Sequence, residues 1–163
     1  AAARQQVVEA AGLLADFARA SGVRVTLEPL HPMYAADRSC LCTLAQARAM
    51  AQAAGADVGV CLDVYHLWWD PDLMAEIARC RGRITGLHIC DWLVPTTDML
   101  NDRGMMGDGV IDIPPIRAAV EAAGFQGFTE VEIFSSENWW KRPMDETLAI
   151  CRERLAWCAQ MPA

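Results

Sequence analysis

The sequence predicts an α/β protein with a parallel β-sheet, and three observations carry this prediction. Short segments rich in β-branched residues alternate with longer segments whose apolar residues recur at helical spacing. The helical segments begin or end at Thr, Asp-Pro, Pro-Pro or Gly signals. The order along the chain is one helix, then a strand and a helix four times. Alternation of this kind indicates helical crossovers between parallel strands.

The first part of the chain predicts a helix, a strand and a second helix. Residues 4–20 carry apolar side chains at helical spacing, and Gly22 follows as a stop signal. Residues 23–27 form a short β-branched segment that predicts a strand. Thr43 can cap a helix that ends before Gly55.

The middle of the chain predicts two more strands with a helix between them. Residues 58–62 predict a strand, and Asp70-Pro71 predicts a helix start, with a capping acid followed by Pro at the first helical position. Residues 84–89 predict the third strand. Residues 90–112 form the longest irregular segment, and a loop of this length in a compact domain is typically functional or disordered.

The last part predicts one more helix, strand and helix. Pro114-Pro115 opens a helix that Gly124 closes, residues 128–134 predict the fourth strand, and residues 143–158 predict the final helix. One helix followed by four βα units fits a doubly wound sheet and half of a (β/α)8 barrel equally well. A complete barrel needs eight units in typically ~250 residues, so this chain of 163 residues can supply half. Because it begins at Ala1 directly in a helical pattern, we expect a fragment.

The composition argues against several classes of protein. The formal net charge is −7, and binding to nucleic-acid phosphates depends on clustered Lys and Arg, so we expect no nucleic-acid partner. No run of about 18 apolar residues predicts a membrane span, and no signal segment opens the chain, so we expect a cytoplasmic protein without membrane contact. The seven cysteines, an odd number, indicate reduced thiols rather than disulfides.

Four candidate metal ligands stand at the ends of the four predicted strands: Glu28, Asp63, His88 and Glu132. Because side chains alternate along a strand, Glu28, Asp63 and Glu132 fall on the less apolar face of their strands, whereas Ile84 shares a face with His88. Three carboxylates and one imidazole form a hard donor set. We expect one divalent ion, Mn²⁺ first, with Mg²⁺, Co²⁺ and Zn²⁺ as alternatives.

Five segments together resemble one family: LEPLHPMYAADR, LDVYHLWWDP, LHICD, MMGDGVIDI and GFTEVEIFSSENWW. They resemble the C-terminal half of the xylose isomerase-like TIM-barrel superfamily, and most closely its sugar-phosphate isomerases and epimerases, including inosose isomerases and ketose 3-epimerases. The resemblance implies that residues 1–163 are one partial (β/α)8 barrel domain, with strands 5 to 8 and their helices and without the N-terminal half.

The resemblance also implies residue roles. Glu28, Asp63, His88 and Glu132 match the family's metal ligands, and Glu28 and Glu132 match its acid and base. His66 matches a histidine that contacts substrate, and Arg103 in the long loop is a further candidate for binding substrate oxygen atoms.

The implied activity is isomerisation or epimerisation of a sugar, sugar phosphate or inosose. The reaction would abstract a proton next to a carbonyl and pass through a metal-stabilised enediolate.

Other residues near the strand ends remain candidates. Glu130 is the alternative to Glu132 as the last ligand, and Asp108 is a second loop candidate for substrate binding. His31 is interpreted as structural. The tryptophans that follow strands can form an apolar wall, stack on a sugar or pack the loops; they are Trp68, Trp69, Trp92, Trp139 and Trp140.

Three other functions remain open. A metal-dependent dehydratase of the same superfamily begins with the same proton abstraction. An inactive truncated half-barrel is the non-enzymatic alternative, and its open sheet edges would favour a homo-oligomer. An endonuclease IV-type nuclease is disfavoured, because that family needs an Asp-x-His pair where this chain reads GDGVID.

Overall fold

The protein is a four-stranded parallel sheet with helices packed on it, so the predicted α/β class is confirmed. The computed structural model describes residues 2–160. Its parallel strands lie in the order β1-β2-β3-β6. Their bounds are Val25–Leu27 for β1, Val58–Asp63 for β2, Ile84–Ile89 for β3 and Thr129–Val131 for β6. Because the order follows the chain, each crossover joins neighbouring strands, as in one half of a barrel.

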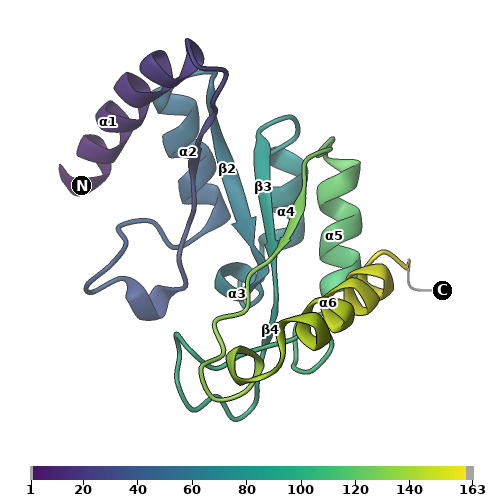
Figure 1. Ribbon diagram of the computed structural model, residues 1–163. Coiled ribbons are helices and arrows are strands. Elements are labelled where there is room, and N and C mark those ends of the chain that lie inside the picture. The colour runs from purple at the N-terminus through teal and green to yellow at the C-terminus, as the bar shows by residue number, and fades with distance from the viewer. Residues whose placement is uncertain (1, 161–163) are drawn as a thin grey trace.

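The helices separate the strands along the chain and pack beside the sheet (Figure 1). They are α1 (Ala2–Arg19), α2 (Leu44–Ala54), α3 (Val64–Leu67), α4 (Leu73–Arg79), α5 (Ile113–Ala122) and α6 (Met144–Cys158), with 3-10 turns at Pro32–Tyr34 and Trp139–Lys141. Strands β2 and β3 point toward the end of the molecule where α3 and β4 lie, and α1 and α2 lie together on one side (Figure 1).

The capping residues in the sequence predict one of these helix starts correctly and another incorrectly. Thr43 caps α2 as predicted, since its side chain accepts a hydrogen bond from the Gln46 amide. The predicted helix start at Asp70-Pro71 is wrong, because α4 begins at Leu73. Asp70 instead accepts a hydrogen bond from the Asp72 amide, which closes a turn ahead of the helix.

The long segment after β3 is more regular than predicted. It contains a small antiparallel pair, β4 (Asp91–Trp92) and β5 (Arg103–Gly104). Asp91 is completely buried and holds the end of the segment, because its carboxylate accepts hydrogen bonds from the amides of Gly107 and Ile111. A buried carboxylate needs such partners, so this loop has a fixed conformation at its base.

The core lies around β2, all six of whose residues are buried. The pairing of β2 with β3 shifts register between Val60 and Cys61, so that Val60 opposes Ile84 and Cys61 opposes Gly86. Thr85 is the extra residue in this bulge. The bulge explains why Ile84 can join the core while His88, four residues on, lies with the acids of the sheet.

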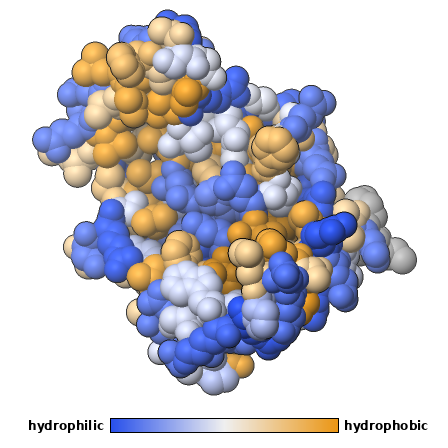
Figure 2. Space-filling model, viewed as in Figure 1, coloured by the Kyte–Doolittle hydropathy of each residue, from blue (hydrophilic) through white to orange (hydrophobic). Residues whose placement is uncertain are grey.

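The outer surface of α1 is unusually apolar. Leu13, Leu14 and Phe17 are all more than half exposed. Figure 2 shows this hydrophobic area over α1, and hydrophilic side chains in the middle of the same view. Among residues 2–160, no helix is long and apolar enough to cross a membrane.

Candidate metal centre

The four predicted ligands meet at the C-terminal end of the sheet. Glu28 directly follows β1, Asp63 is the last residue of β2, His88 lies in β3, and Glu132 directly follows β6. One ligand atom from each lies within 4.8 Å of the others. Parallel strands bring their carboxyl ends to one edge, which is why four residues far apart in sequence converge here.

Asp63 is the most rigidly held member of this cluster. Its side chain is completely buried, and its Oδ1 atom accepts a hydrogen bond of 2.8 Å from the Tyr65 amide. The backbone turns directly into α3 after Asp63, so this bond also caps that short helix. The Oδ2 atom accepts a hydrogen bond of 3.2 Å from Arg103. The carboxylate therefore has a fixed position and orientation.

His88 lies between the two glutamates. Its Nδ1 atom is 3.3 Å from Oε1 of Glu28 and 3.5 Å from Oε2 of Glu132. The Nδ1 atom and the Glu28 Oε1 atom are both buried, and neither has a hydrogen-bond partner in the described structure. Buried polar atoms without partners are costly. A cation between these atoms would satisfy both, so the donor set fits a divalent metal ion.

Glu132 is positioned by the sheet and by Arg103. Its backbone amide donates to the carbonyl of Ile89, which continues the pairing of β3 with β6 by one residue. Its Oε2 atom accepts a hydrogen bond of 3.0 Å from Arg103 Nη1. The same Nη1 atom also donates to Asp63, so a single guanidinium joins two of the four candidate ligands.

The charges of the cluster shift the pKa values of its members. Burial raises the pKa of Asp63 to about 7, although the positive charge of Arg103 opposes this effect. The pKa of Glu132 falls to about 2, chiefly because of its interaction with His88, with burial opposing. Interactions with Cys61, Glu132 and Glu28 raise the pKa of His88. Without a cation, the cluster holds its negative charge with a protonated imidazole and Arg103.

His66 lies beside the cluster. It follows Asp63 by three residues on α3, and its Nε2 atom is 3.6 Å from the Asp63 Oδ2 atom. The side chain is almost completely buried, and burial lowers its pKa to about 3. Its Nδ1 atom has no hydrogen-bond partner in the described part of the chain. His66 is therefore neutral, with its Nε2 atom on the side of Asp63.

Arg103, the loop candidate for binding substrate oxygen atoms, is buried in the structure. It lies in β5 and is only 3% exposed, because its guanidinium packs over the rings of Tyr65 and Phe134 at 4.3 and 4.9 Å from their centroids. Stacking on aromatic faces is typical of buried arginines. The sequence places Arg103 near the site, but it gives no sign that the side chain would bridge two carboxylates.

Two other candidates lie outside the cluster. Glu130 is 68% exposed at its side chain and approaches only the far side of His88, with 3.8 Å between Oε2 and Nε2. Asp108 is exposed and pairs with Arg154 on α6 at 3.4 Å. The structure therefore groups Glu132, and neither Glu130 nor Asp108, with the other ligands.

Aromatic rings form a wall next to the site. The ring of His31 stacks on Trp92 with centroids 5.2 Å apart and meets the edge of Trp69 at 5.7 Å. Its Nδ1 atom accepts a hydrogen bond from the Met33 amide, in agreement with a structural role. Trp92 also stacks on Tyr65 and contacts Trp68.

The other two of the five tryptophans named from the sequence lie in the turn Trp139–Lys141. Trp139 is buried, whereas Trp140 is exposed beside Phe134.

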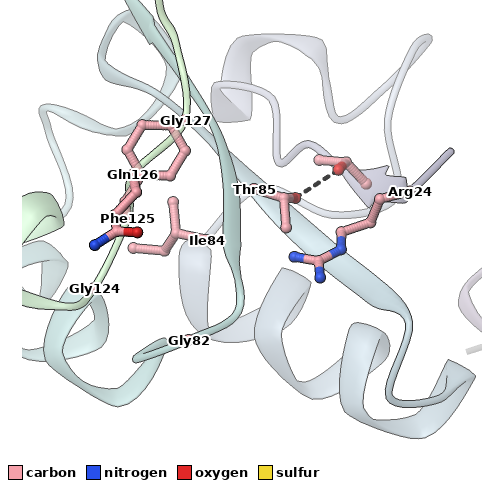
Figure 3. A pocket seen from close by; sticks show the side chains of 9 residues that line it. Arg24, Gly82, Ile84, Thr85, Gly124, Phe125, Gln126 and Gly127 are labelled. Atoms are coloured by element: carbon pink, nitrogen blue, oxygen red, sulfur yellow. Dashed lines mark hydrogen bonds between the residues drawn. The ribbon is translucent and has the colours of Figure 1, made fainter. Parts of the chain in front are cut away.

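A cavity of about 400 Å³ lies away from this cluster (Figure 3). It is lined by residues that precede or begin the strands, such as Arg24, Ile84 and Phe125. Thr26 and Thr85 share a hydrogen bond of 2.6 Å at its wall. No carboxylate, imidazole or thiol is among its lining residues, so this cavity offers no metal ligand.

Comparison with known proteins agrees with this architecture. The family model described as xylose isomerase-like TIM barrel matches residues 1–157. A crystal structure of a protein from Sinorhizobium meliloti 1021 is 59% identical, with a TM-score of 0.93 over 98% of this chain and 58% of that chain. No curated protein sequence matches significantly.

Two more distant structures have the same fold. The 3-keto-D-glucoside 4-epimerase YcjR of E. coli is 26% identical, with a TM-score of 0.69 over 95% of this chain and 52% of that chain. The IolI protein, solved with a bound zinc atom, is 24% identical, with a TM-score of 0.81 over 95% of this chain and 55% of that chain. The chain thus spans little more than half of each, and it belongs to the xylose isomerase-like TIM barrel family.

Proposed function

We propose that this chain is part of a divalent-metal-dependent isomerase or epimerase that acts on a carbohydrate, namely a sugar, a sugar phosphate or an inosose. The observation that carries the proposal is the convergence of Glu28, Asp63, His88 and Glu132 at the C-terminal ends of four parallel strands. In barrels of this kind, the chemistry takes place at that end.

The proposed ligands differ in how accessible their side chains are to a substrate. Asp63 is completely buried and has a backbone hydrogen bond on one oxygen, so it can only hold the metal. The side chains of Glu28 and Glu132 are 34% and 35% exposed, so each can reach a substrate carbon as well as a metal. We assign Glu28 and Glu132 as the acid and base of the reaction, and Asp63 and His88 as ligands.

The protonation states suit this assignment. The lowered pKa of Glu132 keeps its carboxylate ionised at neutral pH, so that it can bind a cation. A bound divalent cation would polarise the substrate carbonyl and stabilise the negative charge that develops on its oxygen. His66 is neutral, lies beside Asp63 and is assigned to substrate binding. Arg103, which is nearly inaccessible, is assigned to positioning Asp63 and Glu132.

The similar structures support a carbohydrate substrate and a metal. YcjR is an epimerase of a keto-glucoside, which is a reaction next to a carbonyl. IolI binds zinc, which supports a divalent metal ion as the cofactor. The oxygen-rich donor set favours Mn²⁺.

Proton exchange into the substrate tests the proposal directly. The chain would be incubated in D2O with Mn²⁺ and a panel of ketoses, keto-glycosides and inososes, and deuterium next to the carbonyl would be followed by NMR. An isomerase or epimerase incorporates deuterium and keeps the substrate's oxygen atoms, whereas a dehydratase loses water. Glu132→Gln should abolish the exchange, and Glu130→Gln, two residues away, should not. Exchange that survives Glu132→Gln would overturn the assignment.

A further inference from the structure

We propose that Cys61 gives this cluster a second mode of metal binding, in which a soft divalent cation such as Zn²⁺ or Cd²⁺ is held by Cys61, Glu28 and His88. The inference rests on the proposed metal site, because two of the three ligands belong to both modes. A soft ion and a hard ion therefore exclude each other. The ion that is present decides whether Asp63 and Glu132 take part in coordination.

The thiol of Cys61 lies within the cluster. Cys61 precedes Asp63 by two residues in β2, so both side chains point to the same face of the strand. The Cys61 sulfur, a carboxylate oxygen of Glu28 and a ring nitrogen of His88 all lie within 4.8 Å of one another. Ligands about 2.0–2.3 Å from a tetrahedral zinc ion are roughly 3.3–3.8 Å apart. The Glu28 and His88 ligand atoms, 3.3 Å apart, already have this spacing.

Gly86 leaves space beside the Cys61 thiol. Gly86 lies opposite Cys61 in the β2–β3 pairing. A Cβ atom at Gly86 would lie 2.8 Å from the Cys61 sulfur, which is closer than such atoms can approach. The missing side chain at Gly86 therefore provides the space in which the sulfur lies, next to the ring of His88.

The two donor sets differ in their ligand chemistry, because only one of them contains a thiol. Thiolate ligands select soft or borderline cations, whereas carboxylates select hard ones. Cys61, Glu28 and His88 offer one sulfur, one oxygen and one nitrogen, to which zinc can add a water as its fourth ligand. The buried Oε1 of Glu28 and Nδ1 of His88 have no hydrogen-bond partner in the described residues, so both can serve as ligands. When the sulfur–metal bond forms, the thiol proton passes to the buffer.

Cobalt spectroscopy tests the inference without any activity measurement. Co²⁺ would be titrated into the reduced chain without oxygen, and the thiolate-to-cobalt absorption in the near ultraviolet would be recorded. We expect one such ion per chain, with the band lost in Cys61→Ala and in Cys61→Ser, which keeps the side-chain size. Cys80→Ala removes a buried thiol at the end of α4, and Cys42→Ser removes a half-buried one. Both should leave the band intact.

A competition experiment measures whether a soft ion displaces a hard one. Bound Mn²⁺ would be displaced by Cd²⁺ and followed by electron paramagnetic resonance. We expect Cys61→Ala to need at least 10-fold more Cd²⁺ than the unchanged chain, while its own affinity for Mn²⁺ stays within about 3-fold.

The outcomes separate the two proposals. If Mn²⁺ binds and depends on Glu132, but the cobalt band is absent or survives Cys61→Ala, the soft-metal mode is wrong and the proposed function stands. If neither Mn²⁺ nor Co²⁺ binds, both proposals fall together.

Discussion

The Nη1 atom of Arg103 lies 3.2 Å from Oδ2 of Asp63, and both side chains are almost completely buried. Burying two charges is costly, and their attraction offsets the cost only while both remain. Arg103 also donates to Glu132. The guanidinium thus holds two carboxylates close together where a cation is expected to add to them.

Replacing Arg103 should therefore destabilise the metal-free chain and increase its response to metal. We expect Arg103→Met to lower the free energy of unfolding by about 3 kcal/mol, since it leaves a buried carboxylate without its partner. Saturating Mn²⁺ should restore more stability in the variant than in the unchanged chain, because the ion supplies the missing positive charge. Urea denaturation with and without Mn²⁺ measures both effects.

Arg142→Met is the matched control, because Arg142 is exposed and pairs with Glu146 at 3.0 Å on the surface. It should change stability by less than about 1 kcal/mol. Equal losses in the two arginine variants would contradict the role given to Arg103.

Substitution of Glu132 and substitution of Glu130 should have different effects on Mn²⁺ affinity. Glu132→Gln removes a proposed ligand, so Mn²⁺ affinity should fall by more than the roughly 10–100-fold typical of losing a residue that only supports a ligand. Glu130→Gln removes an exposed carboxylate 3.8 Å from the far nitrogen of His88 and should change the affinity by less than about 3-fold. Calorimetric titration with Mn²⁺ compares the two. A larger loss for Glu130→Gln would identify Glu130 as the ligand.

The convergence of the four residues was predictable because it depends on few details. In parallel strands the carboxyl ends meet at one edge, so Glu28, Asp63 and Glu132 converge wherever each strand begins. Side-chain alternation alone fails for His88, because the bulge between β2 and β3 changes the parity along β3. Gly86, next to the extra residue Thr85, is a weak hint of this bulge in the sequence, and the strand pairing reveals it.

The surroundings of the cluster could not be predicted in the same way. Arg103 lies in a two-residue strand that is too short to show any periodicity, so nothing marks it as buried. Its partners, Asp63 and Glu132, are 40 and 29 residues away along the chain. Thr43, by contrast, caps its helix through a contact three residues away, and such local contacts are what a sequence pattern can show.

The ionisation of Glu76 should make a pH-dependent contribution to stability. Its side chain is only 5% exposed, and burial raises its pKa, but hydrogen bonds from Arg79 and Arg48 outweigh burial and lower the pKa overall. The folded state therefore favours the ionised form. This stabilisation is complete above the unfolded pKa of about 4.3 and is lost as the pH falls through the lower folded value.

We expect Glu76→Gln to lower the free energy of unfolding by about 1–3 kcal/mol at pH 7. The difference from the unchanged chain should shrink as the pH falls below about 4. Denaturation at several pH values measures it. Glu146→Gln, which breaks an exposed pair with Arg142, is the control and should cost under about 1 kcal/mol. A difference that stays constant down to pH 3 would show that Glu76 acts by packing rather than charge.

The packing of Gly59 against Thr85 leaves no room for a side chain at position 59. A Cβ atom at Gly59 would overlap the side chain of Thr85, with the Thr85 Cβ atom only 2.9 Å away. Thr85 is β-branched, has few rotamers and is tied to Thr26 by a hydrogen bond, so it cannot easily move aside. Gly59→Ala should lower the free energy of unfolding by about 1–3 kcal/mol through overpacking.

Adding Thr85→Ala to Gly59→Ala should relieve most of the overlap, because it removes the two closest atoms at the cost of the Thr26 hydrogen bond. The double variant should therefore lose less stability than the sum of the two single variants, by at least about 0.5 kcal/mol. Urea denaturation of all four proteins gives this coupling. Strict additivity would mean that the strands move apart instead, in which case Mn²⁺ affinity at the C-terminal end of the sheet should fall in Gly59→Ala.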